Sequence, residues 1–214
     1  MTYKQEIKQQ YLIIRNKSFR TKLDLFLFSK CLADRGDIQS FRLEEFNKYS
    51  ITDEAIKTYA AVYWQREYDH EIGGEKIVNL YSLIETWKMI NTKLLADWER
   101  FYGESFGKML PYGYFENLLR GDQCYYCNIK IGDIAKLIDK QKIFKKQETR
   151  GFTMEIDRKE PNREYSSNNV VLCCYWCNNA KTDEFTDVEF WSIAAGIRKV
   201  WEKRLGRKLS KLKN

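Results

Sequence analysis

The sequence predicts a mainly helical protein with a small α+β module in its second half. Over residues 1–119, apolar side chains recur at mostly three- and four-residue steps, which is the spacing of amphipathic helices. After Gly121 the pattern changes to two Cys-x-x-Cys pairs that enclose short apolar runs typical of strands. With 214 residues, 43% of them apolar and 31% charged, the composition is that of a globular protein with a sizeable core.

The N-terminal region is expected to consist of successive helices. Periodic apolar residues predict helices over residues 3–15, 21–33 and 41–49. Capping residues between Ser50 and Glu54 predict the start of the next helix, and Gly73 with Gly74 its end. The clearest helical periodicity runs from residue 75 to residue 102. None of these helices carries a catalytic pattern.

The second half alternates between cysteine pairs, strands and helices. In chain order, the expected elements are a basic amphipathic stretch at 134–146, a strand at 152–156, a turn-rich segment at 159–169, a strand at 170–173, a short helix at 178–181 and a last helix at 187–205.

The cysteine spacing predicts a structural zinc site. Each Cys-x-x-Cys turn can present two thiolates to one metal ion, and two such turns complete a tetrahedral set. The expected ligands are Cys124, Cys127, Cys174 and Cys177. Cys173 would point to the opposite face of its strand and act as a small buried hydrophobe. A redox pair is the alternative. Because 46 residues separate the two pairs, the metal would clamp a subdomain rather than a single hairpin.

The positive charge is concentrated at the C-terminus. The net charge is +7, and residues 198–214 carry eight Lys or Arg side chains against one Glu. A second basic run covers residues 140–150. Such clusters attract a phosphate backbone, although a solvated helix end and a frayed tail would have the same composition. The candidate nucleic-acid contacts are Lys142, Lys145, Lys146, Arg150, Arg198, Lys199, Arg204, Arg207 and Lys208.

The residues between the cysteine pairs resemble a nuclease family. Ile156-Asp157-Arg158 follows the first pair, and residues 169–181 read Asn-Val-Val-Leu-Cys-Cys-Tyr-Trp-Cys-Asn-Asn-Ala-Lys. This order resembles the HNH, or ββα-metal, nuclease superfamily. It is most similar to the zinc-knuckled branch found in phage-encoded and bacterial defence or homing endonucleases. The resemblance covers about residues 120–185 and does not extend to residues 1–119.

The resemblance implies a role for each matching residue. Asp157 and Asn178 would bind a catalytic Mg²⁺ or Mn²⁺, whose preferred ligands are hard oxygens. Asn169 would tie the turn to the motif, and Lys181 would face the phosphate. Arg158 stands where most members have a histidine that serves as the general base.

Arg158 leaves the proton acceptor unassigned. Arginine stays protonated in proteins, so it can clamp a phosphate oxygen but cannot accept a proton from water. The nearby candidates for the base are Glu155, Glu160, Tyr165 and Tyr175. Metal-bound water or a substrate phosphate could suffice instead, or the fold could be kept only for binding. The single histidine, His70, lies in the N-terminal region and is not expected at the site.

We therefore expect a magnesium- or manganese-dependent endonuclease that hydrolyses DNA phosphodiester bonds in phage, restriction, antiviral defence or mobile-element biology. The alternative is a catalytically silent zinc module that binds nucleic acid or a protein partner. RNA as the substrate stays open.

Three regions are expected. Residues 1–119 would form a helical region for target recognition, homodimerisation or docking to a partner. Residues 120–185 would form the zinc-bound nuclease module, and residues 186–214 a helix with a basic tail. The first residues lack the apolar run of a secretion signal, and the apolar run at 25–28 is too short to span a bilayer. We expect an intracellular, cytoplasmic protein.

Overall fold

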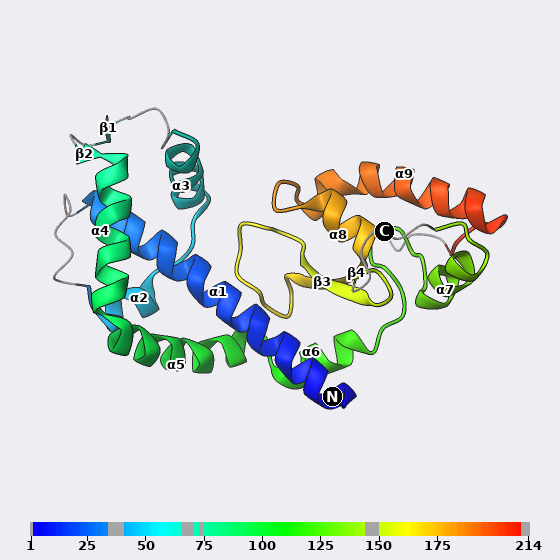
Figure 1. Ribbon diagram of the computed structural model, residues 1–214, viewed down its shortest axis with the longest axis horizontal. Helices are drawn as coiled ribbons and strands as arrows, with labels where there is room; N and C mark the ends of the chain where they lie inside the picture. Colours follow the sequence, from blue (N-terminus) through cyan, green and yellow to red (C-terminus); the bar gives the residue numbers. More distant parts are fainter. Residues whose placement is uncertain (1, 34–40, 66–70, 73–74, 144–149, 211–214) are drawn as a thin grey trace. The chain divides into compact units, whose positions relative to one another are not determined.

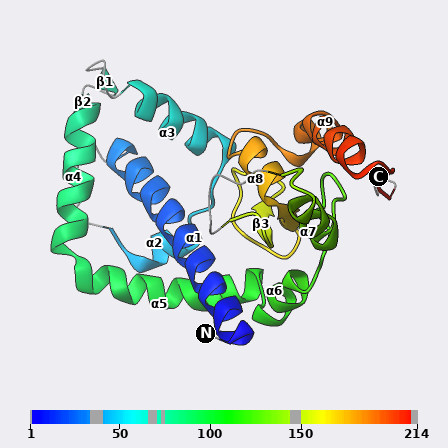
Figure 2. The same ribbon diagram turned by 45° about the vertical axis from the view of Figure 1, so that its right-hand side comes forward.

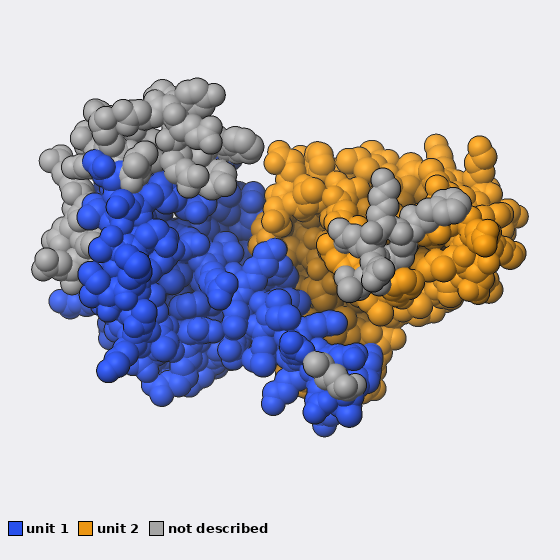
Figure 3. Space-filling view, viewed as in Figure 1, with its two compact units in different colours: residues 1–109, 162–165 blue, residues 110–161, 166–214 orange. Residues whose placement is uncertain are grey.

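The computed structural model describes residues 2–33, 41–65, 71–72, 75–143 and 150–210, with the backbone alone for 61–65, 71–72 and 75–78. The described chain is mainly helical with a small antiparallel sheet in its second half, which confirms the predicted fold class at this coarse level. The chain forms two compact units (Figure 3). Unit 1 comprises Met1–Met109 with Asn162–Tyr165, and unit 2 comprises Leu110–Pro161 with Ser166–Asn214.

One long helix, α1 (Tyr3–Ala33), opens unit 1. The prediction of two separate helices over 3–15 and 21–33 was wrong. The connecting residues 16–20 contain neither glycine nor proline, so the helix continues through them. Ser18 lies in this connecting part and is buried, where its hydroxyl lies 2.7 Å from the Tyr102 hydroxyl.

Short elements follow α1. Helix α2 spans Leu43–Lys48 and helix α3 spans Asp53–Gln65. The Thr52 hydroxyl accepts a hydrogen bond from the Ala55 amide, so the predicted helix start is confirmed. The predicted helix end was wrong, because α3 ends at Gln65 and a two-stranded pair, β1 (Glu71–Ile72) and β2 (Glu75–Lys76), comes next. Gly73, Gly74 and His70 lie outside the described residues.

The periodic stretch predicted at 75–102 is divided into two helices. Helix α4 spans Ile77–Ile90 and helix α5 spans Thr92–Met109. At the junction, the side-chain amide of Asn91 donates to the Trp87 carbonyl oxygen at 2.9 Å. Asparagine competes with the backbone in this way and therefore favours helix ends. Figures 1 and 2 show α4 and α5 meeting at a corner, with α1 packed against both.

Aromatic rings dominate the core of unit 1. Phe46 of α2 stacks on Trp98 of α5, with ring centroids 5.2 Å apart and planes inclined by 23°. Phe26 of α1 packs edge-on against both rings. The aromatic periodicity of the N-terminal helices therefore serves packing, and aromatic pairs of this kind contribute about 0.5–1.5 kcal/mol each beyond the area they bury.

Unit 2 contains both cysteine pairs. Its elements are α6 (Tyr112–Leu119), α7 (Ile131–Asp139), β3 (Met154–Arg158), β4 (Val170–Cys174), α8 (Tyr175–Lys181) and α9 (Asp187–Leu205). Strands β3 and β4 pair antiparallel, with Met154 opposite Cys174 and Arg158 opposite Val170. Helix α8 packs against both strands and against α9 (Figures 1 and 2). No helix in the described part of the chain combines the length and apolar character needed to cross a membrane.

The last helix has both of its ends defined by sequence. The Thr186 hydroxyl accepts from the Glu189 amide, and the Glu189 carboxylate accepts from the Thr186 amide, which forms a capping box. At the other end, Gly206 has φ of 70°, a left-handed conformation that glycine adopts without strain. These signals account for the confirmed prediction of a helix over Asp187–Leu205.

Candidate functional site

Four cysteines of unit 2 form a closed cluster with the geometry of a zinc site. Cys124, Cys127, Cys174 and Cys177 are all buried, and their sulfur atoms lie within 4.8 Å of one another. A zinc ion bound about 2.3 Å from each sulfur of a tetrahedron requires sulfur separations of roughly 3.8 Å. The measured separation between the sulfurs of Cys127 and Cys174 is 3.7 Å. The four cysteines could therefore hold one zinc ion, as the spacing predicts.

Backbone contacts bring the two cysteine pairs together. The amide of Tyr125, inside the first pair, donates to the carbonyl oxygen of Leu172 on β4 at 2.8 Å. After the pair, Asn128 adopts a φ of 60°, which asparagine tolerates better than most residues and which closes the turn. Because all four thiolates are used and buried, a metal here would stabilise the fold and be closed to substrate.

Cys173 lies outside this cluster although it directly precedes Cys174. It is fully buried, and it pairs with Glu155 across the hairpin. Burial raises the pKa of the Cys173 thiol well above its ordinary value, so this thiol stays neutral. The expectation of a buried apolar role agrees with this placement.

The face of β3 that meets α8 gathers the polar residues of the predicted active site. Glu155 and Asp157 are two positions apart on β3 and so project to the same side. Asn178 and Lys181 are three positions apart on α8 and share one face of that helix. The structure matches them in two pairs: Asn178 contacts Glu155, and Lys181 contacts Asp157.

Asp157 is a buried carboxylate with two partners on one oxygen. Its Oδ2 accepts a 2.6 Å hydrogen bond from the Tyr126 hydroxyl and lies 3.4 Å from Nζ of Lys181. Only 8% of the residue is exposed. Burial raises the pKa of Asp157, while the bond from Tyr126 and the charge of Lys181 oppose that shift.

Lys181 points into the protein rather than toward solvent. Its side chain has no exposed surface, and its Nζ donates to the carbonyl oxygen of Arg158 at 2.7 Å in addition to pairing with Asp157. The resemblance implied a lysine facing a phosphate. In the structure Lys181 instead holds the end of β3.

Glu155 is the second carboxylate of this face. It accepts a 2.7 Å hydrogen bond from the side-chain amide of Asn178 and a two-pronged contact from Arg150, at 3.0 and 2.7 Å. The Arg150 guanidinium also lies 5.0 Å from the centre of the Tyr175 ring. Within the described residues, the side-chain oxygen of Asn178 has no hydrogen-bond partner.

Arg158 and Asn169 lie at the turn end of the hairpin. Arg158 pairs with Asp183 at 2.9 Å and is largely buried. The side chain of Asn169 accepts from the Glu160 amide at 2.9 Å and donates to the Glu160 carbonyl oxygen at 3.1 Å. Asn169 therefore ties the two sides of the connecting segment together.

The four candidate bases are not equally placed. Glu155 shares the β3 face with Asp157, whereas Glu160 lies in the connecting segment. Tyr175 lies at the start of α8, beneath Arg150. Tyr165 is buried among the residues that group with unit 1.

Most of the predicted basic contacts are used inside unit 2. Arg198 bonds Glu202 and the Leu209 carbonyl oxygen, and Arg207 pairs with the buried Asp133 at 2.6 Å. Lys142 donates to the Arg204 carbonyl oxygen. Arg204 lies over the Trp201 ring. These residues fasten the C-terminal segment to α7 and α9. Lys145 and Lys146 lie outside the described residues.

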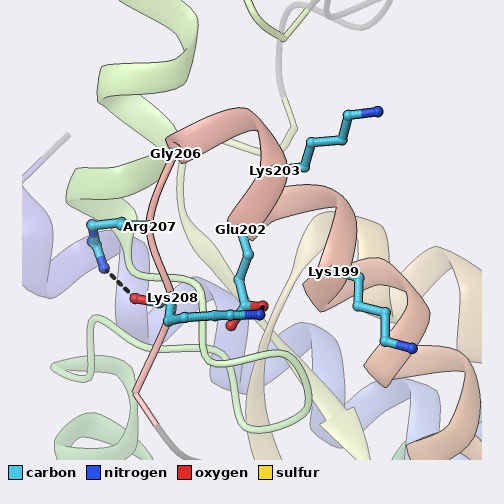
Figure 4. Close-up of a pocket in the computed structure, with 6 residues that line it drawn as sticks. All are labelled: Lys199, Glu202, Lys203, Gly206, Arg207 and Lys208. Carbon is cyan, nitrogen blue, oxygen red and sulfur yellow. Dashed lines mark hydrogen bonds and ion pairs between the residues drawn. The ribbon is translucent and has the colours of Figure 1, made fainter.

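A basic pocket remains at the end of α9 (Figure 4). It has a volume of about 440 Å³ and is lined by Lys199, Glu202, Lys203, Gly206, Arg207 and Lys208. Figure 4 shows Lys199 and Lys203 projecting from the helix, and Lys208 pairs with Glu202 at 3.3 Å. Lys203 was not among the predicted contacts, although its spacing of four residues from Lys199 on a helix could have indicated a shared face. Among described residues, Lys199 and Lys203 have no partner.

Comparison of the chain with protein-family models, with curated proteins and with solved structures gives no match.

Proposed function

We propose that the chain is a divalent-metal-dependent endonuclease that hydrolyses phosphodiester bonds of DNA, with the β3–β4–α8 unit as its active site. One observation carries the proposal: Glu155, Asp157 and Asn178 project from β3 and α8 onto a shared face, beside a four-cysteine cluster that could hold zinc. Carboxylate and amide oxygens are the ligands that Mg²⁺ and Mn²⁺ prefer.

In this proposal Asp157 and Asn178 hold the cation, which would polarise the scissile phosphate and stabilise the leaving oxygen. Lys181 acts by holding Asp157 and the end of β3, not by contacting a phosphate. Arg158 stays protonated and can clamp a phosphate oxygen if it leaves Asp183.

Glu155 is the proton acceptor that the geometry favours. It is a carboxylate on the same strand face as Asp157, and Asn178 touches it directly. A general base contributes about 10²–10⁴-fold to a rate. Arg150 would hold this carboxylate in place through its two-pronged contact.

A second candidate function is a catalytically silent zinc module that binds nucleic acid or a protein partner. The observation that favours it is the state of Asp157, which is buried and already paired with Lys181 and Tyr126. A cation would have to share or displace these contacts.

Supercoiled-plasmid cleavage in Mg²⁺ and in Mn²⁺ separates the two. If the protein is a nuclease, the wild type relaxes or linearises the plasmid and Asp157→Ala abolishes the product. Glu155→Gln should slow cleavage by about 10²–10⁴-fold if Glu155 is the base. The control is Glu184→Gln, the same change at an exposed carboxylate with no side-chain partner among the described residues.

Arg158→His completes the series. Cleavage by the wild type shows that Arg158 is compatible with catalysis. If the Arg158→His variant cleaves the plasmid and the wild type binds DNA without cleaving it, the result supports the silent module. The remaining expectations accompany the proposal: DNA as partner, a cytoplasmic location, phage or defence biology, and recognition or dimerisation by the N-terminal helices.

A further inference from the structure

The first cysteine pair supplies two sulfurs to the four-cysteine cluster, and a residue between the two cysteines, Tyr126, also contacts the proposed cation site. Tyr126 lies between Cys124 and Cys127, and its hydroxyl donates to Oδ2 of Asp157 at 2.6 Å. The two residues are 31 positions apart in the chain, so only the folded module brings them together. The bond is short, and its acceptor is a carboxylate, which makes it one of the stronger hydrogen bonds of proteins.

The Tyr126 ring has little freedom to move. It is fully buried and packs edge-on against Phe190 of α9, with centroids 5.0 Å apart. The rings of Tyr125 and Trp191 also pack against it, with ring centroids 5.1 and 5.7 Å from that of Tyr126. Tyr126 directly precedes Cys127 and follows Cys124 by two positions, so its backbone lies between two members of the four-cysteine cluster. The position of the hydroxyl is therefore set by the zinc knuckle and by α9.

The hydrogen bond from the Tyr126 hydroxyl also determines which carboxylate oxygen of Asp157 is occupied by protein contacts. Tyr126 and Lys181 both contact Oδ2, so this oxygen is anchored from two elements at once. An anchored Oδ2 fixes the rotation of the carboxylate and with it the direction of the other oxygen. Residues that orient a metal-binding carboxylate through a hydrogen bond act on metal affinity without touching the metal.

We propose that Tyr126 is the positioning residue of the Asp157 cation site, and that through it the zinc knuckle controls divalent-cation binding. This inference rests on the proposed function, because it takes Asp157 to be a cation ligand. It goes beyond that function by assigning the knuckle a part in the active site in addition to folding.

The test measures Mn²⁺ binding by electron paramagnetic resonance, without substrate, on the full chain. Tyr126→Phe keeps the ring and removes only the hydroxyl, so zinc content should remain one ion per chain while the Mn²⁺ affinity falls about 10–100-fold. In an Asp157→Asn background the same change should have little further effect, because the group that Tyr126 positions is altered.

Tyr125→Phe is the matched control. Tyr125 occupies the same cysteine pair, but its hydroxyl bonds Asp187 at 3.4 Å and its ring is partly exposed. Removal of the Tyr125 hydroxyl should leave the Mn²⁺ affinity unchanged.

A second measurement needs no substitution. The buried Tyr126 hydroxyl should give a slowly exchanging proton resonance that shifts saturably on titration with Mg²⁺. The hydroxyl of Tyr102, which is also buried and donates to Glu164 at 2.8 Å in unit 1, should not shift. This Mg²⁺ titration tests the positioning role of Tyr126 even if the Tyr126→Phe variant does not retain zinc.

The outcomes separate the two proposals. Mn²⁺ binding that depends on Asp157 but is equal in Tyr126→Phe and the wild type, or Mg²⁺ binding at Asp157 that leaves the Tyr126 resonance unmoved, overturns the positioning role and leaves the nuclease proposal standing. Absence of any Asp157-dependent cation binding overturns both.

Discussion

The ammonium group of Lys181 lies 3.4 Å from Oδ2 of Asp157, and the lysine side chain has no exposed surface. The pair joins α8 to the end of β3, because the same Nζ also donates to the Arg158 carbonyl oxygen. An ion pair in this setting is shielded from water on both sides, so neither partner is easily replaced alone.

Removing the charge of Lys181 should therefore destabilise unit 2 strongly. Lys181→Met keeps an unbranched side chain one atom shorter than lysine but leaves Asp157 buried without its cation, a change that typically costs about 3–5 kcal/mol. Denaturant unfolding should show this loss, and Lys181→Met with Asp157→Asn should lose less than the sum of the single changes. Lys136→Met, at an exposed position of α7, is the control. A loss below about 1 kcal/mol for Lys181→Met would contradict the structural role of the pair.

Neighbouring cysteines should differ in their effect on zinc. Cys174→Ala removes a member of the cluster, so the protein should lose its zinc and unit 2 should unfold at a lower temperature. Cys173→Ala, one position earlier, should keep one zinc per chain and lose only packing. Metal content by mass spectrometry and the midpoint of thermal unfolding check this. Equal zinc loss in both variants would show that the ligand set is wrong.

Glu202 should make the attachment of the C-terminal segment dependent on pH. Its carboxylate accepts from the Leu209 amide and pairs with Lys208 and Arg198, and these contacts lower the pKa of Glu202. A lowered pKa in the folded state means that stability is gained above the unfolded pKa, about 4.3, and lost as the pH falls through the folded value.

The difference in thermal midpoint between the wild type and Glu202→Gln should thus stay constant from about pH 7 to pH 5 and shrink below about pH 4.3. Taking the difference removes the effect of acid on the cysteine cluster, which both proteins share. If the difference in thermal midpoint grew as the pH fell, folding would have to raise the pKa of Glu202, which would contradict the stabilising contacts assigned to its carboxylate.

Lys199 and Lys203, which have no partner among the described residues, should contribute most to nucleic-acid binding at the basic pocket of α9. Lys199→Glu with Lys203→Glu should weaken binding to a DNA duplex and reduce the slope of log affinity against log salt by about 2, because each lysine that neutralises a phosphate adds roughly one to that slope. Lys4→Glu with Lys8→Glu, also four residues apart and exposed on α1, changes the net charge equally and should leave the slope unchanged. Equal effects of both pairs would indicate that only overall charge matters.

Helix boundaries followed from the sequence where a local signal sets them. The capping box at Thr186 and the glycine at 206 define α9, and Thr52 defines the start of α3. Two boundaries were missed. Residues 16–20 carry no stop signal, so α1 is continuous, and α4 and α5 are separated at Asn91, whose side chain bonds the Trp87 carbonyl oxygen.

The sequence by itself determined the four-cysteine cluster and the order of strand, strand and helix, because these depend on residue type and on short spacings along the chain. Only the tertiary structure decided that Lys181 is buried against Asp157, that Asn178 meets Glu155, and that Tyr126 reaches across 31 residues to Asp157. Pairing between side chains depends on how α8 and the first cysteine pair dock on β3. That docking is set by the whole core of unit 2, and no local pattern encodes it.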